Sequence, residues 1–291
     1  MQTEGMIVRS VSGFYTVETD AGCIECKARG RFRKEKLSPL VGDRVRIEAE
    51  EGQAVVSEIL PRRSAFIRPP VANLDLLVLF ASDAIPVSDP FLLDRICSNA
   101  ALQGVPVVIC VNKCDIRTEK SVAEIYERSG IPTVRTSTES GEGIVQLKSL
   151  ISGKFCAFTG NSGVGKSSML NRLDAALRLP TGEVSEKLGR GRHTTRHVQV
   201  YTLSDGTRIA DTPGFSAFDC ECTEISAPDA IAGTFPEFRP YIGQCRYADC
   251  SHRREPDCAV RTAVAQGRVM PSRYDSYCRL YELALQRKQW E

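Results

Sequence analysis

The chain of 291 residues is long enough for two or three domains, each with its own hydrophobic core. Its 42% hydrophobic and 25% charged residues are ordinary for a globular protein, and with a net charge of +2 any affinity for nucleic acid must come from local patches. The N-terminus lacks a basic stretch followed by an apolar one, and the longest apolar run, 76–81, is too short to span a bilayer, so we expect neither a signal peptide nor a membrane partner.

Residues 1–68 contain short runs in which apolar and polar residues alternate, as they do along half-buried strands. These runs are 6–9, 14–19, 22–27, 44–47 and 54–59. Five short strands in a segment of this length predict a small β-barrel of the OB-fold type.

A basic stretch follows the third of these runs. Between Lys27 and Lys36, six Lys or Arg residues accompany a single acid, Glu35, so the local charge is six minus one, or +5. Phe32 lies in the middle of the stretch. Because OB-folds hold RNA by neutralising phosphates and by stacking bases on aromatic rings, we predict that this stretch binds RNA, with Phe32 as the stacking ring. A solvated basic loop is the alternative.

The next segment leads to a guanine-recognition motif. A predicted strand at 74–81, a helix at 90–103 and a buried strand at 105–111 precede Asn112-Lys113-Cys114-Asp115, which has the N-K-x-D pattern of GTPases. The Asp115 carboxylate would accept hydrogen bonds from guanine N1–H and the exocyclic amine, which adenine cannot supply. The Lys113 stem would pack over the base, and Asn112 would tie this loop to the phosphate loop. A turn that caps the next segment is the alternative for Asn112 and Asp115.

A second guanine-contacting loop is predicted after the short strand 133–135. Ser137-Thr138 matches the S-A-like loop of GTPases, with Thr as a small departure in the second place. In α/β sheets ligands bind at the carboxyl ends of the strands, so both loops are expected at the same edge.

A phosphate-binding loop comes next in the chain. The segment 160–167 has the pattern G-x-x-x-x-G-K-S between an apolar run, 155–158, and a helical segment, 168–173, which is the strand–loop–helix order that a P-loop requires. Its backbone N–H groups would surround the phosphates at the positive end of the helix. Lys166 would reach the β- and γ-phosphates, and Ser167 would bind Mg²⁺. The residues expected to contact GTP here are Gly160, Asn161, Ser162, Gly163, Val164, Gly165, Lys166, Ser167 and Ser168.

The order of these motifs is unusual. Ordinary GTPases place the phosphate loop before the guanine motifs, whereas this chain has the guanine motifs first, so the α/β domain is predicted to be circularly permuted. Because domain termini lie at the surface and often close together, permutation can leave the sheet intact.

Two switch segments are predicted beyond the phosphate loop. The Gly- and Arg-rich segment 189–196 is typical of a mobile loop, and its Thr195, or alternatively Thr194, would close on Mg²⁺ and the γ-phosphate. A hairpin over 197–210 leads to the D-x-x-G motif, in which Asp211 would hold Mg²⁺ through water and the Gly214 N–H would sense the γ-phosphate.

Phe215 stands where many GTPases carry the glutamine that orients the attacking water. An apolar ring cannot orient water, so we expect slow intrinsic hydrolysis. Either His193 or a partner would supply the missing group, and a solvated loop residue is the alternative for His193.

The C-terminal region contains a predicted metal site. Cys245, Cys250, His252 and Cys258 offer three thiolates and one imidazole, the donor set of a closed structural zinc site without a catalytic position. Buried free cysteines are the alternative. Arginines flank the ligands, as in a metal knuckle that contacts RNA. A helix over 273–289 is also expected, with Tyr277, Leu280, Tyr281, Ala284 and Leu285 on its core-facing side.

Cys23 and Cys26 are spaced like half a zinc site. Positions three apart on an alternating strand face opposite sides, so we interpret these two cysteines as structural.

Together, the barrel, the permuted motifs, the Gly-Arg-His-Thr-Thr segment and the Cys-Cys-His-Cys cluster resemble the circularly permuted, ribosome small-subunit-dependent GTPase A family (RsgA/YjeQ/YloQ), over nearly the whole chain. The resemblance implies a monomeric cytoplasmic GTPase that binds the small ribosomal subunit and its rRNA late in maturation, is stimulated by the subunit and leaves after hydrolysing GTP to GDP. It implies Mg²⁺ with GTP and one structural Zn²⁺, and a division into an OB-fold domain (1–68), a permuted GTPase domain (69–218) and a zinc-binding domain (219–291).

Other classes of function remain open. An RNA-binding scaffold with a passive GTP/GDP sensor site would show no turnover stimulated by the subunit. A P-loop ATPase or kinase is the other alternative, and the N-K-x-D motif argues against it. Because switch two runs from Gly214 directly into the C-terminal domain, we also hypothesise that the γ-phosphate biases the orientation of that domain, which would link GTP and RNA affinities reciprocally.

Overall fold

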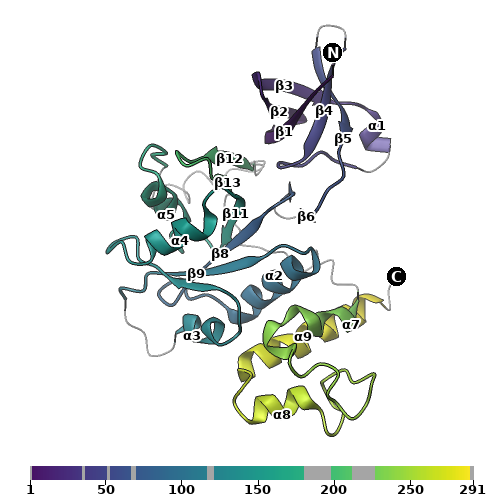
Figure 1. Ribbon diagram of the computed structural model, residues 1–291, viewed down its shortest axis with the longest axis vertical. Helices are drawn as coiled ribbons and strands as arrows, with labels where there is room; N and C mark the ends of the chain where they lie inside the picture. Colours follow the sequence, from purple (N-terminus) through teal and green to yellow (C-terminus); the bar gives the residue numbers. More distant parts are fainter. Residues whose placement is uncertain are drawn as a thin grey trace.

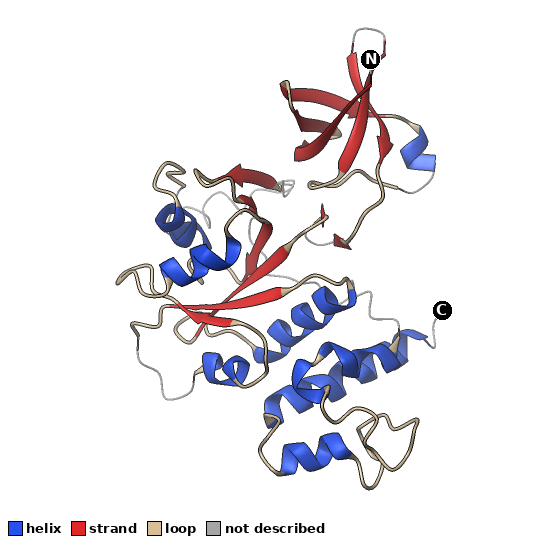
Figure 2. Cartoon of the chain, viewed as in Figure 1, coloured by secondary structure: helices blue, strands red, loops and turns tan. Residues whose placement is uncertain are grey.

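The computed structural model describes residues 2–34, 37–50, 53–66, 70–116, 121–179, 198–211 and 227–288. A β-barrel lies at one end of the molecule, an α/β region lies in the middle, and a helical C-terminal region packs beside helix α2 at the other end (Figure 1). Strands are therefore concentrated in the first two regions and helices in the last two (Figure 2). The predicted boundaries at 68 and 218 lie outside the described residues.

The barrel is built from the five strands that the alternation predicts. They are β1 (Gln2–Val11), β2 (Phe14–Thr19), β3 (Gly22–Ala28), β4 (Arg44–Glu50) and β5 (Gln53–Ile59). β1 pairs with both β2 and β4, and β3 pairs with β5, so the sheet closes on itself. Ile7, Val17 and Val45 are fully buried inside it. Cys26 is also buried whereas Cys23 is exposed, which confirms that the two thiols face opposite sides.

The central sheet has the order β10-β9-β8-β11-β13-β12. Its strands are β8 (Leu76–Ser82), β9 (Val107–Asn112), β10 (Thr133–Arg135), β11 (Phe155–Gly160), β12 (Gln199–Thr202) and β13 (Arg208–Asp211). All neighbours are parallel except β12 and β13, which form the predicted hairpin. The carboxyl ends of β8, β9, β10, β11 and β13 therefore lie at one edge, where ligands of parallel sheets bind.

Helices cover both faces of this sheet, which is why its strands read as continuous apolar runs. Helices α2 (Pro90–Leu102) and α3 (Val122–Glu127) pack on one face, and α4 (Ile144–Ile151) and α5 (Lys166–Leu173) pack on the other. Alternate residues of β8 serve the two cores: Leu77 and Leu79 face α2, whereas Val78 and Phe80 face α5.

The barrel is joined to the central sheet more closely than a linker would require. β1 forms a bridge to β12 at Arg9 and Gln199, so hydrogen bonding runs on from the central sheet into the barrel. Gly42, at a φ of +90°, lies so close to the α/β region that a Cβ there would be 2.2 Å from the Ala72 carbonyl oxygen. A short hairpin, β6 (Ala65–Phe66) and β7 (Val71–Ala72), flanks this contact.

The C-terminal region contains α7 (Pro228–Ile231), two 3₁₀ turns η1 (Ala232–Thr234) and η2 (Pro236–Phe238), α8 (Ala259–Ala265) and α9 (Pro271–Lys288). Tyr277, Leu280 and Ala284 on α9 are buried, as predicted, whereas Leu285 lies exposed at the rim. Among the described residues no helix combines the length and apolar character needed to cross a membrane.

Candidate nucleotide site and metal centre

The phosphate loop connects the carboxyl end of β11 to the start of α5. Glycine is required at both of its ends because the backbone is in the left-handed region and other groups approach closely. A Cβ at Gly160 would lie 2.4 Å from the Phe80 carbonyl oxygen, and one at Gly165 would lie 2.2 Å from Nδ2 of Asn112. Ser162 and Gly163 are exposed at the crest of the loop, where a ligand can reach them.

Lys166 folds back over this loop. Its Nζ donates hydrogen bonds to the carbonyl oxygens of Gly160 (2.7 Å) and Asn161 (2.8 Å). Burial lowers the pKa of Lys166 to about 8, and the nearby Asp211 carboxylate partly opposes this shift. A half-desolvated ammonium surrounded by carbonyl oxygens is suited to exchanging those contacts for phosphate oxygens.

The N-K-x-D segment lies beside the phosphate loop at the end of β9. Asn112 is fully buried and its Nδ2 donates to the Val164 carbonyl oxygen (2.9 Å), while its Oδ1 accepts from the Thr136 hydroxyl (3.2 Å). One side chain thus connects the phosphate loop, the guanine motif and the loop after β10. Asp115 is exposed beyond it, with its carboxylate accessible to a base.

Lys113 takes a left-handed conformation, with a φ of 64°, and its Nζ donates to the Ile85 carbonyl oxygen (2.7 Å). The loop 83–89, between β8 and α2, therefore belongs to the site, although no sequence pattern indicated it. The loop also lies against the phosphate loop, since a Cβ at Gly163 would lie 3.3 Å from Cδ of Pro86.

The Ser137-Thr138 loop is held by contacts within the protein. The buried Ser137 Oγ accepts from the backbone N–H groups of Glu139 (3.2 Å) and Ser140 (3.1 Å), so this hydroxyl shapes the turn. Arg172 on α5 donates to the carbonyl oxygens of Thr138 (2.7 Å) and Glu139 (3.1 Å). Sequence reasoning missed Arg172, because an exposed arginine on a helix carries no signal of such a role.

The switch residues are only partly described. Asp211 ends β13 beside β11, half-buried and close enough to Lys166 to influence its pKa. His193, Thr194, Thr195, Gly214 and Phe215 lie outside the described residues.

The basic stretch of the barrel differs from the prediction in one respect. Part of it forms the short helix α1 (Arg31–Lys34), and Phe32 is only 4% exposed because it joins the hydrophobic core of the barrel. A buried ring cannot stack on a base, so the predicted role of Phe32 was wrong. Phe14 on β2 is instead 42% exposed, and the Lys27 Nζ lies 5.3 Å from the centre of its ring.

The four predicted metal ligands converge in the C-terminal region. The donor atoms of Cys245, Cys250, His252 and Cys258 all lie within 4.8 Å of one another. His252 Nδ1 is 3.3 Å from the Cys245 Sγ and 3.5 Å from the Cys258 Sγ. Backbone N–H groups of residues 252 and 259 point at the sulfurs of Cys250 and Cys245, an arrangement that stabilises thiolates. Three sulfurs and one imidazole nitrogen at this spacing fit tetrahedral Zn²⁺.

The backbone around the cluster is fixed by side chains of its own region. The Glu255 carboxylate accepts hydrogen bonds from the Ser251 N–H and hydroxyl and from the N–H groups of Arg253 and Arg254. Tyr274 on α9 donates to the His252 carbonyl oxygen (2.9 Å). The ligand loop is therefore tied to the long C-terminal helix.

The chain has a P-loop on a mostly parallel sheet, and a buried asparagine joins this loop to an N-K-x-D motif that precedes it in the chain. These features define a circularly permuted P-loop GTPase. The model of the RsgA GTPase family matches residues 59–221, and that of the RsgA N-terminal domain matches residues 4–56. The chain belongs to the RsgA GTPase family and is a GTP-hydrolysing enzyme.

Relatives and solved structures agree with this assignment. The chain is 43% identical over 282 residues to the small ribosomal subunit biogenesis GTPase RsgA of Caldanaerobacter subterraneus subsp. tengcongensis, covering 95% of this chain and 94% of that one. It is 43% identical over 296 residues to the protein of the same name from Agathobacter rectalis, covering 96% and 97%. Its fold resembles the crystal structure of YjeQ from Thermotoga maritima, with a TM-score of 0.79 and 33% identity over 98% of this chain and 99% of that one. It also resembles YloQ, described as a circularly permuted GTPase, with a TM-score of 0.74 and 32% identity over 99% and 96% of the two chains.

Proposed function

We propose that this GTPase acts in maturation of the small ribosomal subunit, binds the subunit's rRNA and is stimulated by the subunit. The relatives' names support the target, and the hydrogen bond from Asn112 to Val164 is the observation that carries the GTP site. That bond makes a base-recognition loop and a phosphate-binding loop parts of one site. A role on ribosomal subunits implies a cytoplasmic protein, and we expect it to act as a monomer.

In this proposal the phosphate loop 160–168 surrounds the phosphates with backbone N–H groups, and the Lys166 ammonium neutralises charge on the β- and γ-phosphates. Asp115 reads guanine through its carboxylate, the Lys113 stem covers the base, and the backbone of Ser137-Thr138 completes the pocket, since the Ser137 hydroxyl already serves the turn.

A magnesium ion bound with GTP would be held by Ser167 and Thr195 directly and by Asp211 through water. The positions of Ser167 and Asp211 support this, since Ser167 follows Lys166 at the start of α5 and β13 ends at Asp211 beside β11. When bound, the ion neutralises charge that develops on the phosphate oxygens. His193 is proposed to orient the attacking water, Gly214 to sense the γ-phosphate, and the subunit to bring these groups into place.

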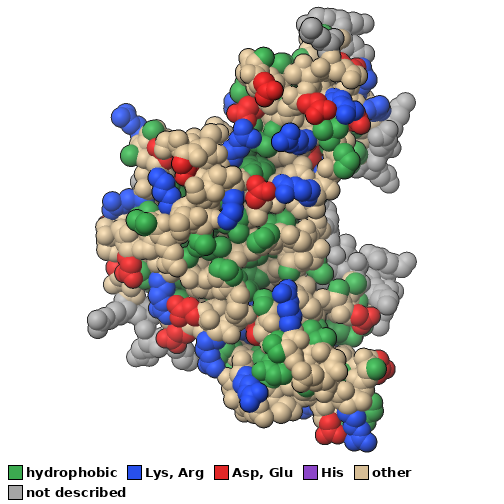
Figure 3. Space-filling model, viewed as in Figure 1, with side chains coloured by type: hydrophobic (Ala, Val, Ile, Leu, Met, Phe, Trp, Pro, Cys, Tyr) green, Lys and Arg blue, Asp and Glu red, His purple; other side chains and the backbone are tan. Residues whose placement is uncertain are grey.

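The barrel and the metal centre are proposed as two rRNA contacts. On the barrel the exposed Phe14 ring, with Lys27 beside it, takes the stacking role. Near the metal centre Tyr247 is 42% exposed, with the Arg246 guanidinium 5.8 Å from the centre of its ring. On the face drawn in Figure 3, Lys and Arg side chains are interspersed with Asp and Glu side chains, and we expect the rRNA contacts to be local.

The experiment is to measure GTP hydrolysis by the full chain with and without purified small ribosomal subunits, with Lys166→Ala in parallel. Strong stimulation that the variant loses supports the proposal. Nucleotide binding without stimulated turnover would instead favour an RNA-binding scaffold with a passive GTP/GDP sensor site.

A second measurement tests the base assignment. Asp115→Asn should exchange guanine for xanthine recognition, because the Asn amide donates to the xanthine O2 and no longer accepts from the guanine amine. Unchanged competition by GDP and by xanthosine diphosphate would contradict the role of Asp115. Equal affinity of the wild-type protein for the subunit with GDP and with a non-hydrolysable GTP analogue would contradict the proposed linkage of GTP and RNA affinities.

A further inference from the structure

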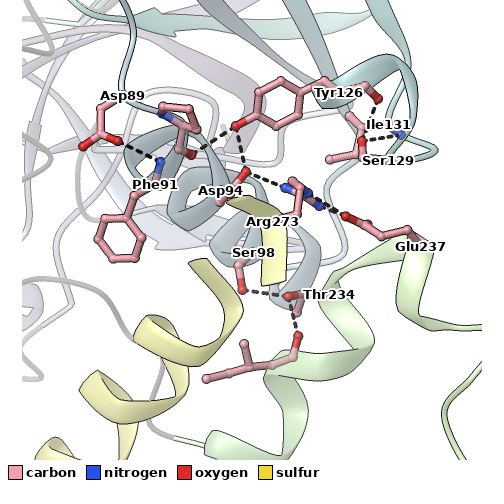
Figure 4. Close-up of polar contacts among 12 residues, drawn as sticks. Asp89, Phe91, Asp94, Ser98, Tyr126, Ser129, Ile131, Thr234, Glu237 and Arg273 are labelled. Atoms are coloured by element: carbon pink, nitrogen blue, oxygen red, sulfur yellow. Dashed lines mark hydrogen bonds and ion pairs between the residues drawn. The ribbon is translucent and has the colours of Figure 1, made fainter. Parts of the chain in front are cut away.

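A charged network that is buried almost completely joins the C-terminal region to helix α2 (Figure 4). The Arg273 guanidinium on α9 donates to Asp94 on α2 (2.5 Å) and, through two nitrogens, to Glu237 of η2 (2.6 and 3.1 Å). The side chains of Asp94, Arg273 and Glu237 are 0%, 1% and 6% exposed. A single arginine therefore holds one carboxylate from the GTPase domain and one from the C-terminal region.

Neighbouring groups fix this network in one geometry. The Tyr126 hydroxyl on α3 contacts both Asp94 Oδ1 (2.7 Å) and the Pro90 carbonyl oxygen (3.1 Å). The rings of Phe235 and Tyr126 lie 4.6 and 5.5 Å from the guanidinium carbon. Burial raises the pKa of Asp94, and Arg273 opposes this shift.

Stability alone is a weak explanation for such a network. Buried ion pairs can often be replaced by apolar side chains with little loss of stability, because desolvation offsets much of the attraction between the charges. A planar guanidinium also fixes direction, because its N–H donors lie in one plane and point outward along its edges, so that they can bond both carboxylates in only one arrangement. The network is therefore suited to setting the position of α2 relative to α9.

The position of α2 matters because this helix continues from the loop 83–89 of the nucleotide site. Asp89 caps the helix by accepting from the Phe91 N–H (2.9 Å). Ile85 accepts the hydrogen bond from Lys113 of the guanine motif, and Pro86 lies against the phosphate loop at Gly163. Asp83 accepts from the Ser121 hydroxyl and the N–H of residue 122 at the start of α3.

We propose that Arg273 is a positioning residue for the nucleotide site: by holding Asp94 and Glu237 together, it keeps the loop 83–89 against the guanine motif and the phosphate loop. This inference rests on the nucleotide site of the proposed function. It differs from the linkage through switch two, because this route runs from Glu237 on η2 and Arg273 on α9 through Asp94 on α2 to the loop 83–89, and it includes no switch-two residue.

The test uses the full chain carrying Arg273→Met, which keeps much of the side-chain volume and removes the charge. We expect fluorescent GDP to bind five- to tenfold more weakly. The ratio of the affinity for GDP to the affinity for inosine diphosphate (IDP) should also fall. IDP lacks the exocyclic amine of guanine, so a displaced guanine motif, which recognises that amine less well, would lose more affinity for GDP than for IDP. Leu280→Ala is the matched control, since it removes buried volume from the same helix and leaves the network intact.

Affinity and the GDP/IDP ratio are compared at a temperature where circular dichroism shows all variants folded. The proposal is supported if GDP affinity and the GDP/IDP ratio fall in Arg273→Met but not in Leu280→Ala. It is overturned if the two variants have equal affinities and ratios, or if the losses of affinity follow the urea midpoints of the variants. If Arg273→Met does not fold, Tyr126→Phe removes only the hydroxyl that bonds Pro90 and Asp94, and a twofold or greater loss of GDP affinity is expected. Unchanged affinity in Tyr126→Phe would then overturn the proposal. If the wild-type protein fails to bind GDP, the proposed function itself fails.

Discussion

The link between the two nucleotide motifs can be tested by removing one side chain, Asn112. In Asn112→Ala the Val164 carbonyl oxygen loses its donor and the Thr136 hydroxyl loses its acceptor, although Thr136 keeps the Cys110 sulfur 3.3 Å away. Each buried polar group left unpaired costs about 1–3 kcal/mol. Since one of the two groups keeps a weak partner, we expect the free energy of unfolding to fall by about 2–4 kcal/mol.

Nucleotide binding should weaken as well. Without Asn112 the phosphate loop and the guanine loop must be brought together when the ligand binds, and this ordering reduces the affinity for GDP by roughly ten- to a hundredfold, or about 1.4–2.8 kcal/mol. Urea unfolding without nucleotide and titration with fluorescent GDP measure the two effects separately.

Asp115→Ala is the matched control for this experiment. Asp115 is exposed, so its removal should weaken GDP binding while leaving the urea midpoint almost unchanged. If Asn112→Ala also kept the wild-type midpoint, or if it lost stability without losing GDP affinity, the reasoning that one buried amide holds the two loops together would be refuted.

Three further predictions concern other parts of the chain. Burial lowers the pKa of Lys166 to about 8, and phosphate oxygens favour its charged ammonium, so GDP binding should take up a proton above about pH 8 and weaken as the pH rises further. Calorimetry in two buffers of different ionisation enthalpy measures this proton uptake, and equal apparent binding heats in the two buffers would contradict it. Cys258→Ser should lose bound zinc and unfold the C-terminal region, and retention of one zinc per chain by atomic absorption would argue against the ligand set. Phe32→Ala should cost the barrel about 3–5 kcal/mol in urea unfolding, whereas Phe14→Ala should keep its stability and bind RNA more weakly; the reverse pattern would restore Phe32 as the stacking ring.

Much of the fold could be predicted because its signals are local. The alternation along residues 14–19 and 54–59 depends only on which face of a strand is buried, and it found all the barrel strands. Likewise the helix over 90–103 and the hairpin over 197–210 follow from apolar periodicity and a turn. The metal cluster could also be predicted from the sequence, since its four ligands lie within fourteen residues.

What the sequence could not provide depends on contacts between distant segments. Phe32 stands among six cations, and nothing local indicates that helix α1 turns its ring into the barrel. Asp94 and Arg273 are 179 positions apart, and each looks like an ordinary surface charge on an amphipathic helix. The pairing of β1 with β12 joins strands that no local pattern relates.

The permuted order of the chain explains how the C-terminal region is connected to the nucleotide site. In the sheet order, β11 lies between β8, where the chain enters the central sheet, and β13, where the described chain leaves it, so the entry and exit strands flank the strand that carries the phosphate loop. The chain enters β8 at the edge away from the nucleotide and leaves β13 at Asp211, on the nucleotide edge. The C-terminal region is therefore joined to the site covalently through the segment after Asp211 and, by our inference, through Arg273 and Asp94. If both connections transmit the nucleotide state, Arg273→Met should reduce, but not abolish, the difference in subunit affinity between GDP and a non-hydrolysable GTP analogue. Complete loss of that difference would assign the coupling to the α2 route alone, and an unchanged difference would assign it to switch two.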